Sequence, residues 1–545
     1  MTRKFYTGFL LILIGNCFTA AAQDTIKTPH TGSDTISIVN LIHSDRLRFK
    51  KVDSLTQLQI VAGLVELQQD KTLFFCDSAV INKYLNTMEA FGHIHINDAD
   101  SIHTRSEYLI YDIKNKLAIL KKKVSLTDGN GTLTTDELHY DTKSKLGTYT
   151  TGGKIVNGKT IITSKEAVYY GDLKDVYFKG DVKMRDPQYD LDTDSLLYNT
   201  ESQLVTFISK TYIKDSTGGT VVTSDGFYDM KSKIARFGKR PLIKDGKGVT
   251  VIGDEVYTND STGQTIVKGN GVYKDSAQKI SVVAGNIFAD KKKYTFFATL
   301  HPLMIIEQDK DSIYVSADTL FSARVSDIRD PHYHELQRDT IKNVMVMNVK
   351  DSSEPRYFQC YHHVRIFSDS LQAVCDSMFY SATDSVFRLY TNPIVWASQS
   401  QITGDTIYLY TKNKKAERMY VFENSFAINI SGENMFNQVS GKTLNGYFKD
   451  GEINFMRTKG SPAQSIYYAK DEKDAMVGVN NAVGDIIDMQ FEDKALKKVI
   501  FRNDVSGTMY PVNQVPEEKK TLRNFIWLEA KRPKTKFELF EDLNQ

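Results

Sequence analysis

The sequence predicts an all-β protein, an elongated folded antiparallel sheet built from repeats of about 29–30 residues. Three observations lead to this prediction. Tyrosines recur at a nearly constant spacing, the segments before them alternate apolar and polar residues, and glycines interrupt the segments after them. The chain also contains 29 Tyr and 29 Phe, residue types that favour strands, and no long amphipathic helix appears within the array.

The first element in chain order is a secretory signal peptide, predicted at residues 1–22. Arg3 and Lys4 supply its charged start, residues 9–14 its apolar stretch, and the alanines at 20–22 its cleavage site. The apolar stretch is too short to span a bilayer, and no later segment approaches about 18 consecutive apolar residues. We therefore expect an exported chain that is soluble or held at a membrane by partners.

The charge of the mature chain excludes some functions. Without Arg3 and Lys4, 67 basic residues stand against 67 acidic residues. Nucleic-acid binders and polybasic membrane-surface proteins need a positive excess, so we predict no nucleic-acid partner.

The repeat itself begins with an alternating strand that ends in an aromatic residue. Spacings of 29, 29, 29, 30, 29 and 31 residues separate Tyr111, Tyr140, Tyr169, Tyr198, Tyr228, Tyr257 and Phe288. Leu138 and Tyr140 alternate within one strand, so they share a face. The turn after Tyr140 reads Asp-Thr-Lys-Ser-Lys, and its Asp and Ser side chains can bond the local backbone.

A second strand follows each turn and is broken by glycine, as Gly180 breaks the run from Val176 to Met184. Glycine inside a strand marks a bend, so we expect a sheet that folds over to give two facing inner surfaces. Two strands per unit at ~4.8 Å give roughly 10 Å of rise per repeat, which makes the molecule a long column.

The pattern divides the chain into several segments. It departs most from the repeat around residues 327–331. We predict a signal peptide at 1–22, a first array at 23–324, an irregular connector at 325–355, a second array at 356–515 and a C-terminal tail at 516–545. For this tail, docking and a loose end both stay open.

The cysteines do not form a disulfide framework. Three remain after cleavage, and an odd number in an exported chain forbids full pairing. Cys76 and Cys375 occupy the same Cys-Asp-Ser position in the repeat, so we interpret both as small buried side chains. A Cys360–Cys375 bridge stays open. Asn16 before Cys17 disfavours a lipoprotein.

Few residues suggest metal or catalytic chemistry. Acids at calcium-loop spacing are Asp190, Asp192, Asp194 and Glu201, but Ser195 replaces the turn glycine and no helices flank them. The pairs His93 with His95 and His332 with His334 lack a third ligand. We interpret these residues as exposed strand positions. The chain also lacks a G-x-S-x-G elbow, so we predict no enzyme, no metal and no cofactor.

The repeated unit resembles the OstA family, the LptA-type periplasmic proteins of lipopolysaccharide transport. Its pattern is Ser/Thr-Asp-x-Leu-x-Tyr, a polar turn, an alternating apolar run, glycine, then Val-x-Leu/Met-x-Asp, seen best in residues 193–198 and 178–186. The resemblance implies a periplasmic open β-jellyroll whose apolar trough holds lipid A acyl chains. It also implies end-to-end contact with other β-jellyroll transport components. The chain is far longer than a minimal LptA, and it lacks the C-terminal strand set expected for the barrel of LptD.

These inferences together predict a periplasmic lipid-binding conduit that takes part in lipopolysaccharide transport to the outer membrane. The residues expected to line its trough are Leu138, Tyr140, Tyr169, Val182, Met184, Leu196, Tyr198 and Tyr228. The same stripe of residues would also suit a closed, dry core, and both interpretations stay open. The alternative function is a structural or adhesive β-solenoid at the cell surface.

Overall fold

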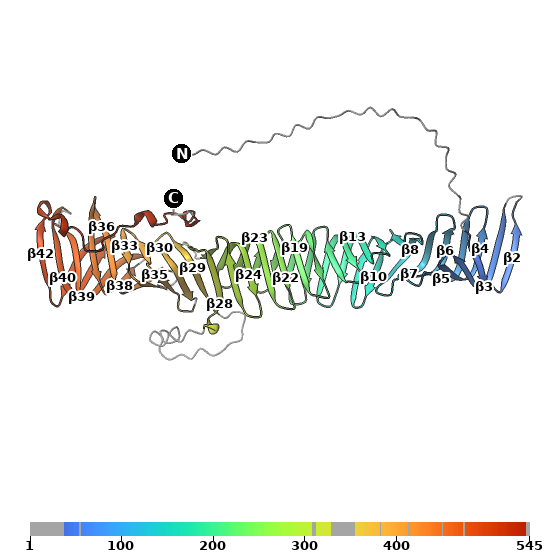
Figure 1. The fold of residues 1–545 in the computed structure, drawn as a ribbon, viewed down its shortest axis with the longest axis horizontal. Coiled ribbons are helices and arrows are strands. Elements are labelled where there is room, and N and C mark those ends of the chain that lie inside the picture. The colour runs from blue at the N-terminus through green and yellow to red at the C-terminus, as the bar shows by residue number, and fades with distance from the viewer. Residues whose placement is uncertain are drawn as a thin grey trace, which may run out of the picture.

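The computed structural model describes residues 38–53, 56–307, 312–328, 355–381, 383–412, 415–449, 451–471 and 475–540. The predicted signal peptide, Cys17, most of the predicted connector, His332 and His334 lie outside these ranges. The described residues form one sheet of 42 strands, and the pairings along it are antiparallel. The molecule is a long column, with strands stacked along its axis (Figure 1).

The first fourteen strands are β1 (Asn40–His43), β2 (Arg46–Lys51), β3 (Gln57–Gln69), β4 (Thr72–Asn82), β5 (Thr87–Asp98), β6 (Ile102–Asp112), β7 (Leu117–Thr127), β8 (Thr132–Asp141), β9 (Leu146–Tyr149), β10 (Gly153–Asn157), β11 (Thr160–Ser164), β12 (Glu166–Tyr170), β13 (Asp175–Arg185) and β14 (Tyr189–Asn199). The next fourteen are β15 (Leu204–Phe207), β16 (Thr211–Asp215), β17 (Thr220–Thr223), β18 (Asp225–Asp229), β19 (Ile234–Gly238), β20 (Leu242–Lys244), β21 (Val249–Ile252), β22 (Glu255–Asn259), β23 (Gln264–Asp275), β24 (Ile280–Asp290), β25 (Thr295–Thr299), β26 (Leu303–Ile306), β27 (Ile313–Ser316) and β28 (Thr319–Arg324).

The last fourteen strands are β29 (Arg356–Phe367), β30 (Leu371–Ser381), β31 (Val386–Tyr390), β32 (Ile394–Ala397), β33 (Ser400–Thr403), β34 (Thr406–Lys412), β35 (Lys415–Phe422), β36 (Ser425–Gly432), β37 (Met435–Gly441), β38 (Thr443–Lys449), β39 (Glu452–Lys470), β40 (Met476–Glu492), β41 (Ala495–Arg502) and β42 (Ser506–Pro511). Five short 3-10 turns complete the elements: η1 (Val325–Asp327), η2 (Val512–Gln514), η3 (Glu517–Lys519), η4 (Glu529–Lys531) and η5 (Glu538–Phe540). None of the described helical segments is a candidate membrane span.

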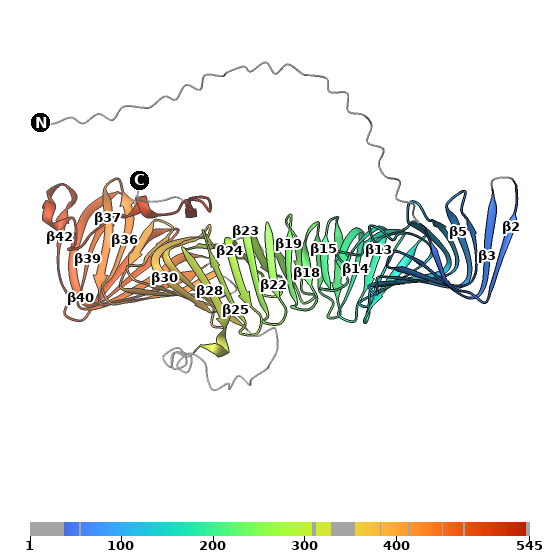
Figure 2. The same ribbon diagram turned by 45° about the vertical axis from the view of Figure 1, so that its right-hand side comes forward.

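The sheet folds along its length into two walls, which Figure 2 shows best at the two ends of the column. Wall 1 contains short strands such as β10, β11, β16 and β17, and wall 2 contains short strands such as β9, β12, β15 and β18. Long strands such as β13 and β14 run through both walls. The fold class predicted from the sequence, an all-β folded antiparallel sheet, is therefore confirmed.

A pair of residues in left-handed backbone conformation bends several of the long strands between the walls. In β13 the pair is Gly180 and Asp181, with φ of 74° and 50°, and the register with β14 shifts at this point. In β23 the pair is Gly269 and Asn270. The glycine bend predicted at Gly180 is thus confirmed, and Gly269 forms the same bend. The same bend also forms without glycine, at His362 and His363 in β29.

Aspartate side chains hold the turns at the outer edges of both walls. The Oδ1 atom of Asp141 accepts from the backbone N–H groups of Lys143 and Ser144 at 2.8 and 3.2 Å. Asp215 and Asp245 cap wall-1 turns in the same way. These bonds replace backbone partners that the turn leaves unpaired. The Asp-x-Lys-Ser-Lys pattern predicted them for the turn at Asp141, and the turns at Asp215 and Asp245 form them with other sequences.

The two walls pack their inner faces against each other. Along wall 2 the direct cross-strand neighbours on this face run Tyr111, Ala118, Tyr140, Gly147, Tyr169, Val176, Tyr198, Val205, Tyr228 and Ala235. Large rings alternate with small residues, so each ring covers the space that the next small residue leaves. We call this series the tyrosine row.

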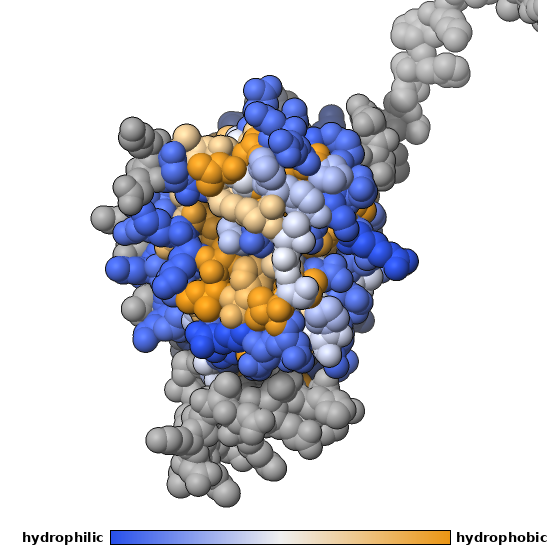
Figure 3. Space-filling model, turned by 90° about the vertical axis from the view of Figure 1, so that its left-hand side faces the viewer, coloured by the Kyte–Doolittle hydropathy of each residue, from blue (hydrophilic) through white to orange (hydrophobic). Residues whose placement is uncertain are grey.

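The sheet continues without a break across the predicted connector. β28 pairs with β29 over Thr319–Arg324, and β27 pairs with β29 at Tyr314–Ser316. At the far end, β40 to β42 are the last strands of the column, and the end face has an apolar centre within a hydrophilic rim (Figure 3). Exposed apolar residues at or beside these strands include Val477, Val505 and Met509.

Candidate functional site

The structure places all eight predicted lining residues on the inner faces of the walls. Tyr228 is the most exposed of them at 9%, and the others are at most 2% exposed. Val182 and Met184 lie in the wall-1 part of β13, and the other six lie in wall 2. The inward orientation that the alternation predicted is therefore present, while contact with lipid stays a prediction.

Hydrogen bonds tie the outer edges of the two walls together in the first third of the column. The Tyr140 hydroxyl, from wall 2, donates to Oδ2 of Asp98 in wall 1 at 2.6 Å. The Tyr169 hydroxyl donates to Oδ2 of Asp128 at 3.0 Å, and the Tyr111 hydroxyl donates to Gln69. We call these three bonds the latch bonds. They join the outer edges of the two walls over β3 to β12. We call this joined edge the closed mouth of the trough, where the trough is the space between the walls.

The protonation states of the latch groups favour these bonds. Burial, followed by the hydrogen bond to Asp98, raises the pKa of Tyr140 far above its usual range, so its hydroxyl keeps the proton that it donates. Burial by itself would raise the pKa of Asp128. Hydrogen bonds from Gly131, Thr200, Asn130 and Tyr169 outweigh burial and lower this pKa, so the carboxylate stays ionised as an acceptor.

Further contacts extend the closed mouth to about residue 203. The Thr200 hydroxyl donates to Asp128 at 2.7 Å, and Nδ2 of Asn157 donates to the Thr200 carbonyl at 2.7 Å. Nε2 of Gln203 donates to Oδ1 of Asn157 at 3.4 Å. These bonds again join a wall-2 turn to a wall-1 strand end.

The tyrosine row stops at Tyr228. The next inward positions with the same cross-strand alignment are Thr258 in β22 and Ala289 in β24, because Ala235 pairs with Thr258 and Thr265 pairs with Ala289. Tyr257 and Phe288 stand one residue earlier and therefore point to the outer face. Thr258 and Ala289 are thus small side chains at two inward positions where the tyrosine row would otherwise continue with large rings.

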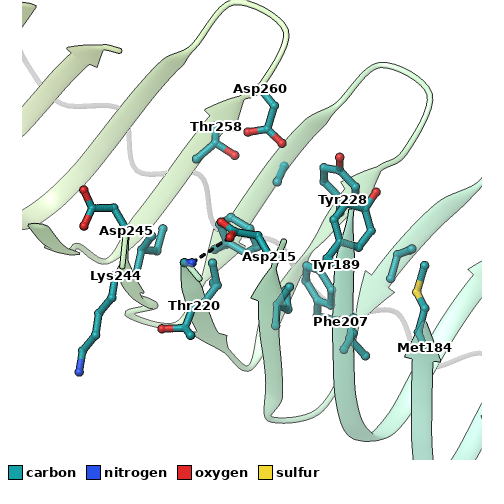
Figure 4. A pocket seen from close by; sticks show the side chains of 18 of the residues that line it. Met184, Tyr189, Phe207, Asp215, Thr220, Tyr228, Lys244, Asp245, Thr258 and Asp260 are labelled. Carbon is teal, nitrogen blue, oxygen red and sulfur yellow. Dashed lines mark hydrogen bonds between the residues drawn. The ribbon is translucent and has the colours of Figure 1, made fainter. Parts of the chain in front are cut away.

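A cavity opens between the walls at this place. Its volume is about 160 Å³. Apolar side chains from both walls form its floor: Met184, Leu191, Val205, Phe207, Ile213, Val221, Ala235, Phe237 and Ile243. Of the predicted lining residues, Met184 and Tyr228 border it. Figure 4 shows Tyr189 and Tyr228 side by side at one end and Thr258 and Asp260 on the wall-2 side.

The rim of this cavity carries charges of both signs. Asp215 and Asp245 come from wall-1 turns, and Asp260 and Lys291 from wall 2. Lys244 extends away from the cavity in Figure 4. Burial raises the pKa of Asp260, although Lys291 and Lys233 act in the opposite direction. The site therefore combines an apolar interior with a polar mouth, which suits a molecule that has an apolar chain and a polar head.

The other candidate groups are dispersed. Asp190 and Asp192 face outward on β14 and pair with Arg185, and Asp194 accepts from Ser195. His93 forms a hydrogen bond with Asp77. Nε2 of His95 lies 3.1 Å from Nδ1 of His103, so His95 is paired with His103 and not with His93. Within the described ranges, no three His, Cys, Asp or Glu residues gather as a metal site would require.

The three described cysteines are free thiols. Burial raises the pKa of both Cys76 and Cys360 to about 12, and it raises that of Cys375 as well. Cys76 and Cys375 are buried, as their position in the repeat predicted, and Cys360 and Cys375 are not bridged.

The sequence did not single out the wall-1 partners of the latch bonds or the residues of the cavity rim. The wall-1 partner of each latch tyrosine lies about 42 residues earlier in the sequence, as Asp98 does for Tyr140. A search for polar residues at that separation from the inward tyrosines would have found Gln69, Asp98 and Asp128, but not the residues of the cavity rim.

Comparison with known proteins finds a family that is similar to part of the chain. Residues 37–194 match the family described as OstA-like protein. No curated protein matches the chain. Among solved structures, it is similar to LptH, the LptA homologous periplasmic component of the lipopolysaccharide transport device of Pseudomonas aeruginosa, at 17% identity and a TM-score of 0.18. That match covers 20% of this chain and 83% of LptH. The resemblance seen in the repeats is therefore confirmed over residues 37–194, where the chain is similar to OstA-like proteins.

Proposed function

We propose that this protein is a periplasmic lipid conduit that takes part in lipopolysaccharide transport to the outer membrane. Acyl chains of lipopolysaccharide or lipid A occupy the space between the two walls. The protein has no catalytic role in this proposal. The OstA-like segment at residues 37–194 supports the pathway, and the signal peptide predicted at residues 1–22 supports an exported, periplasmic location.

The apolar cavity between Met184 and Phe237 is the observation that carries the proposal. Each CH₂ group that leaves water for an apolar environment gains about 0.8 kcal/mol, so a chain seated there is held without any polar contact. A cavity of about 160 Å³ is similar in size to apolar cavities that bind benzene. It therefore admits only part of one acyl chain, and fuller occupancy requires the walls to separate.

The closed mouth over β3 to β12 suggests how the walls separate. Each latch bond is a single hydrogen bond, which contributes only about 0.5–1.5 kcal/mol net, or about 1.5–3 where it joins a charged group. An acyl chain that enters between the walls can offset this loss through its own burial. In this proposal the latch bonds open one after another as lipid moves along the trough.

The partners in this proposal are other β-jellyroll transport components that meet the column end to end. The apolar centre of the end face in Figure 3 supports this, because an apolar interior exposed at the end of a stack needs a cover. The arrays at 23–324 and 356–515 then act as one continuous path, since the sheet runs unbroken between them. Antiparallel pairing differs from the wound parallel coils of a β-helix, which disfavours the alternative of a structural or adhesive β-solenoid at the cell surface.

The test is lipid carried through purification in mild detergent and identified by mass spectrometry. We expect acyl chains with the wild-type protein and at least a fivefold lower amount with Thr258→Tyr, because this change restores a ring at the point where the tyrosine row stops. The matched control is Tyr257→Phe, one residue away and outward, which should retain wild-type lipid. Absence of lipid from the wild type, or equal lipid in Thr258→Tyr, would contradict the proposal.

A further inference from the structure

The chain after the last strand runs back along the outside of the column. Residues 512–540, which we call the strap, leave β42 and lie over the outer face of wall 1 above β36, β33 and β30 (Figure 1). The strap contains only short 3-10 turns and takes no part in the strand ladder. The C-terminal tail predicted from the sequence is thus docked in its described part.

Glutamine side chains hold the strap by its backbone. Nε2 of Gln438 donates to the Lys520 carbonyl at 2.9 Å, and the Leu522 N–H donates to Oε1 of the same side chain at 2.8 Å. Gln401 repeats this arrangement with the Ile526 carbonyl at 2.8 Å and the Leu528 N–H at 2.7 Å.

These glutamines belong to one cross-strand row on the outer face. Gln372 pairs with Trp396, which pairs with Gln401, and Ile428 links Gln401 to Gln438. Gln372 accepts from Arg532 at 2.9 Å. Gln401 and Gln438 are each 1% exposed, so the strap covers them fully. Because the strap provides this cover, both amides need a backbone donor and a backbone acceptor from the segment that lies over them.

Apolar side chains of the strap occupy a second hydrophobic cluster, separate from the interior of the column. Leu522 packs with Phe426, Ile428 and Ile466. The rings of Phe525 and Trp527 lie 5.3 and 5.5 Å from the ring of Phe436. The surface therefore recognises an aliphatic residue followed by aromatic residues three and five positions later.

The far end of the strap is also bonded to the sheet but leaves a cavity beneath it. Arg365 donates to the Glu538 carbonyl at 2.7 Å, and Ser316 donates to the Leu539 carbonyl at 2.9 Å. Between the strap residues Lys531, Leu539 and Phe540 and the sheet, a cavity of about 480 Å³ remains. The strap thus covers this part of the surface without filling it.

We propose that this outer face of wall 1 is a docking site for an extended polypeptide, which the strap occupies in cis and which an extended segment of a partner protein can occupy instead. Recognition through main-chain N–H and C=O groups does not depend on the side chains of the bound segment, as in strand addition to a sheet edge. Specificity comes from the three apolar anchor positions. The proposal does not depend on lipid binding inside the column.

The test uses the full-length protein and a labelled peptide of residues 516–540. Phe525→Ala with Trp527→Ala in the protein weakens the strap in cis while the peptide keeps its anchors. We expect this variant to bind the peptide at least tenfold more tightly than the wild type. Adding Gln401→Ala and Gln438→Ala should reverse this gain, whereas Gln464→Ala, elsewhere on the outer sheet surface, should not.

Hydrogen exchange of the unmodified protein is a second test of the proposal, and it needs no variant. We expect the Leu522 and Leu528 amides to exchange at least tenfold faster than the paired amides of β33, because the strap opens without the sheet. Exchange as slow as that of β33 would show that the strap is a permanent part of the fold. Either this result or failure of the strap variant to bind the peptide would overturn the proposal.

Discussion

The interior of this protein depends on a few polar side chains at the edge of an apolar space. Asp98 is 4% exposed, and its two oxygens accept from Thr72 at 2.9 Å and from Tyr140 at 2.6 Å. A buried carboxylate is tolerated only when such donors surround it. The latch residues therefore stabilise the closed walls, and their loss should have a measurable cost.

Asp98→Ala should lower the free energy of unfolding by about 1–3 kcal/mol, because it leaves the buried hydroxyls of Tyr140 and Thr72 without their acceptor. Chemical denaturation monitored by circular dichroism measures this change. The control is Tyr170→Phe, whose ring is 40% exposed and which should change stability by less than about 0.5 kcal/mol. Equal effects from the two variants would show that the latch bond contributes nothing.

Asp128 should give the closed mouth a dependence on pH. Its pKa is lowered in the folded protein, so the unfolded chain binds a proton more readily at acidic pH. The stabilisation is therefore complete above the unfolded value of about 4 and is lost as the pH falls through the lower folded value. Asp128→Asn should flatten this part of the curve of melting temperature against pH. An unchanged slope between about pH 2 and 4 would contradict this role.

At the scale of strands, the bends and turns follow from local residues, but the face of a strand does not follow from spacing alone. The aromatic spacing led to Tyr257 and Phe288, whereas the inward positions are Thr258 and Ala289. A displacement of one residue moves a side chain to the opposite face of a strand. The bend at His362 and His363 was not predicted either, because glycine was the only sequence signal used to predict a bend.

One short strand depends on a glycine more than the others do. Gly226 in β18 has φ of +124°, and a Cβ atom there would lie 1.9 Å from the Arg236 carbonyl oxygen. Gly226→Ala should therefore lower the melting temperature by several degrees, since neither the backbone conformation nor the neighbouring strand accepts a side chain. Gly131→Ala is the control, because its Cβ would meet only ordinary contacts at 3.5 Å or more. Similar melting temperatures for the two variants would contradict this role of Gly226.

At the scale of the whole molecule, the sequence predicted the column and its repeat but not what closes or covers it. The latch bonds join residues about 42 positions apart, and the strap bonds join residues 82 to 223 positions apart. Neither set has a local pattern, because each depends on how many repeats lie between its partners. The cavity between the walls likewise cannot be located until the register of every preceding strand is known.

The section of the trough between Met184 and Phe237 is where we expect acyl chains to be held. Site-specific photocrosslinking in cells tests this most directly, with a benzophenone amino acid in place of Phe207 inside the cavity and, as control, in place of Tyr212 on the outer face, which is 51% exposed. We expect a lipopolysaccharide adduct at position 207 and none at position 212. No adduct at 207, or equal adducts at both positions, would contradict lipid binding in this section.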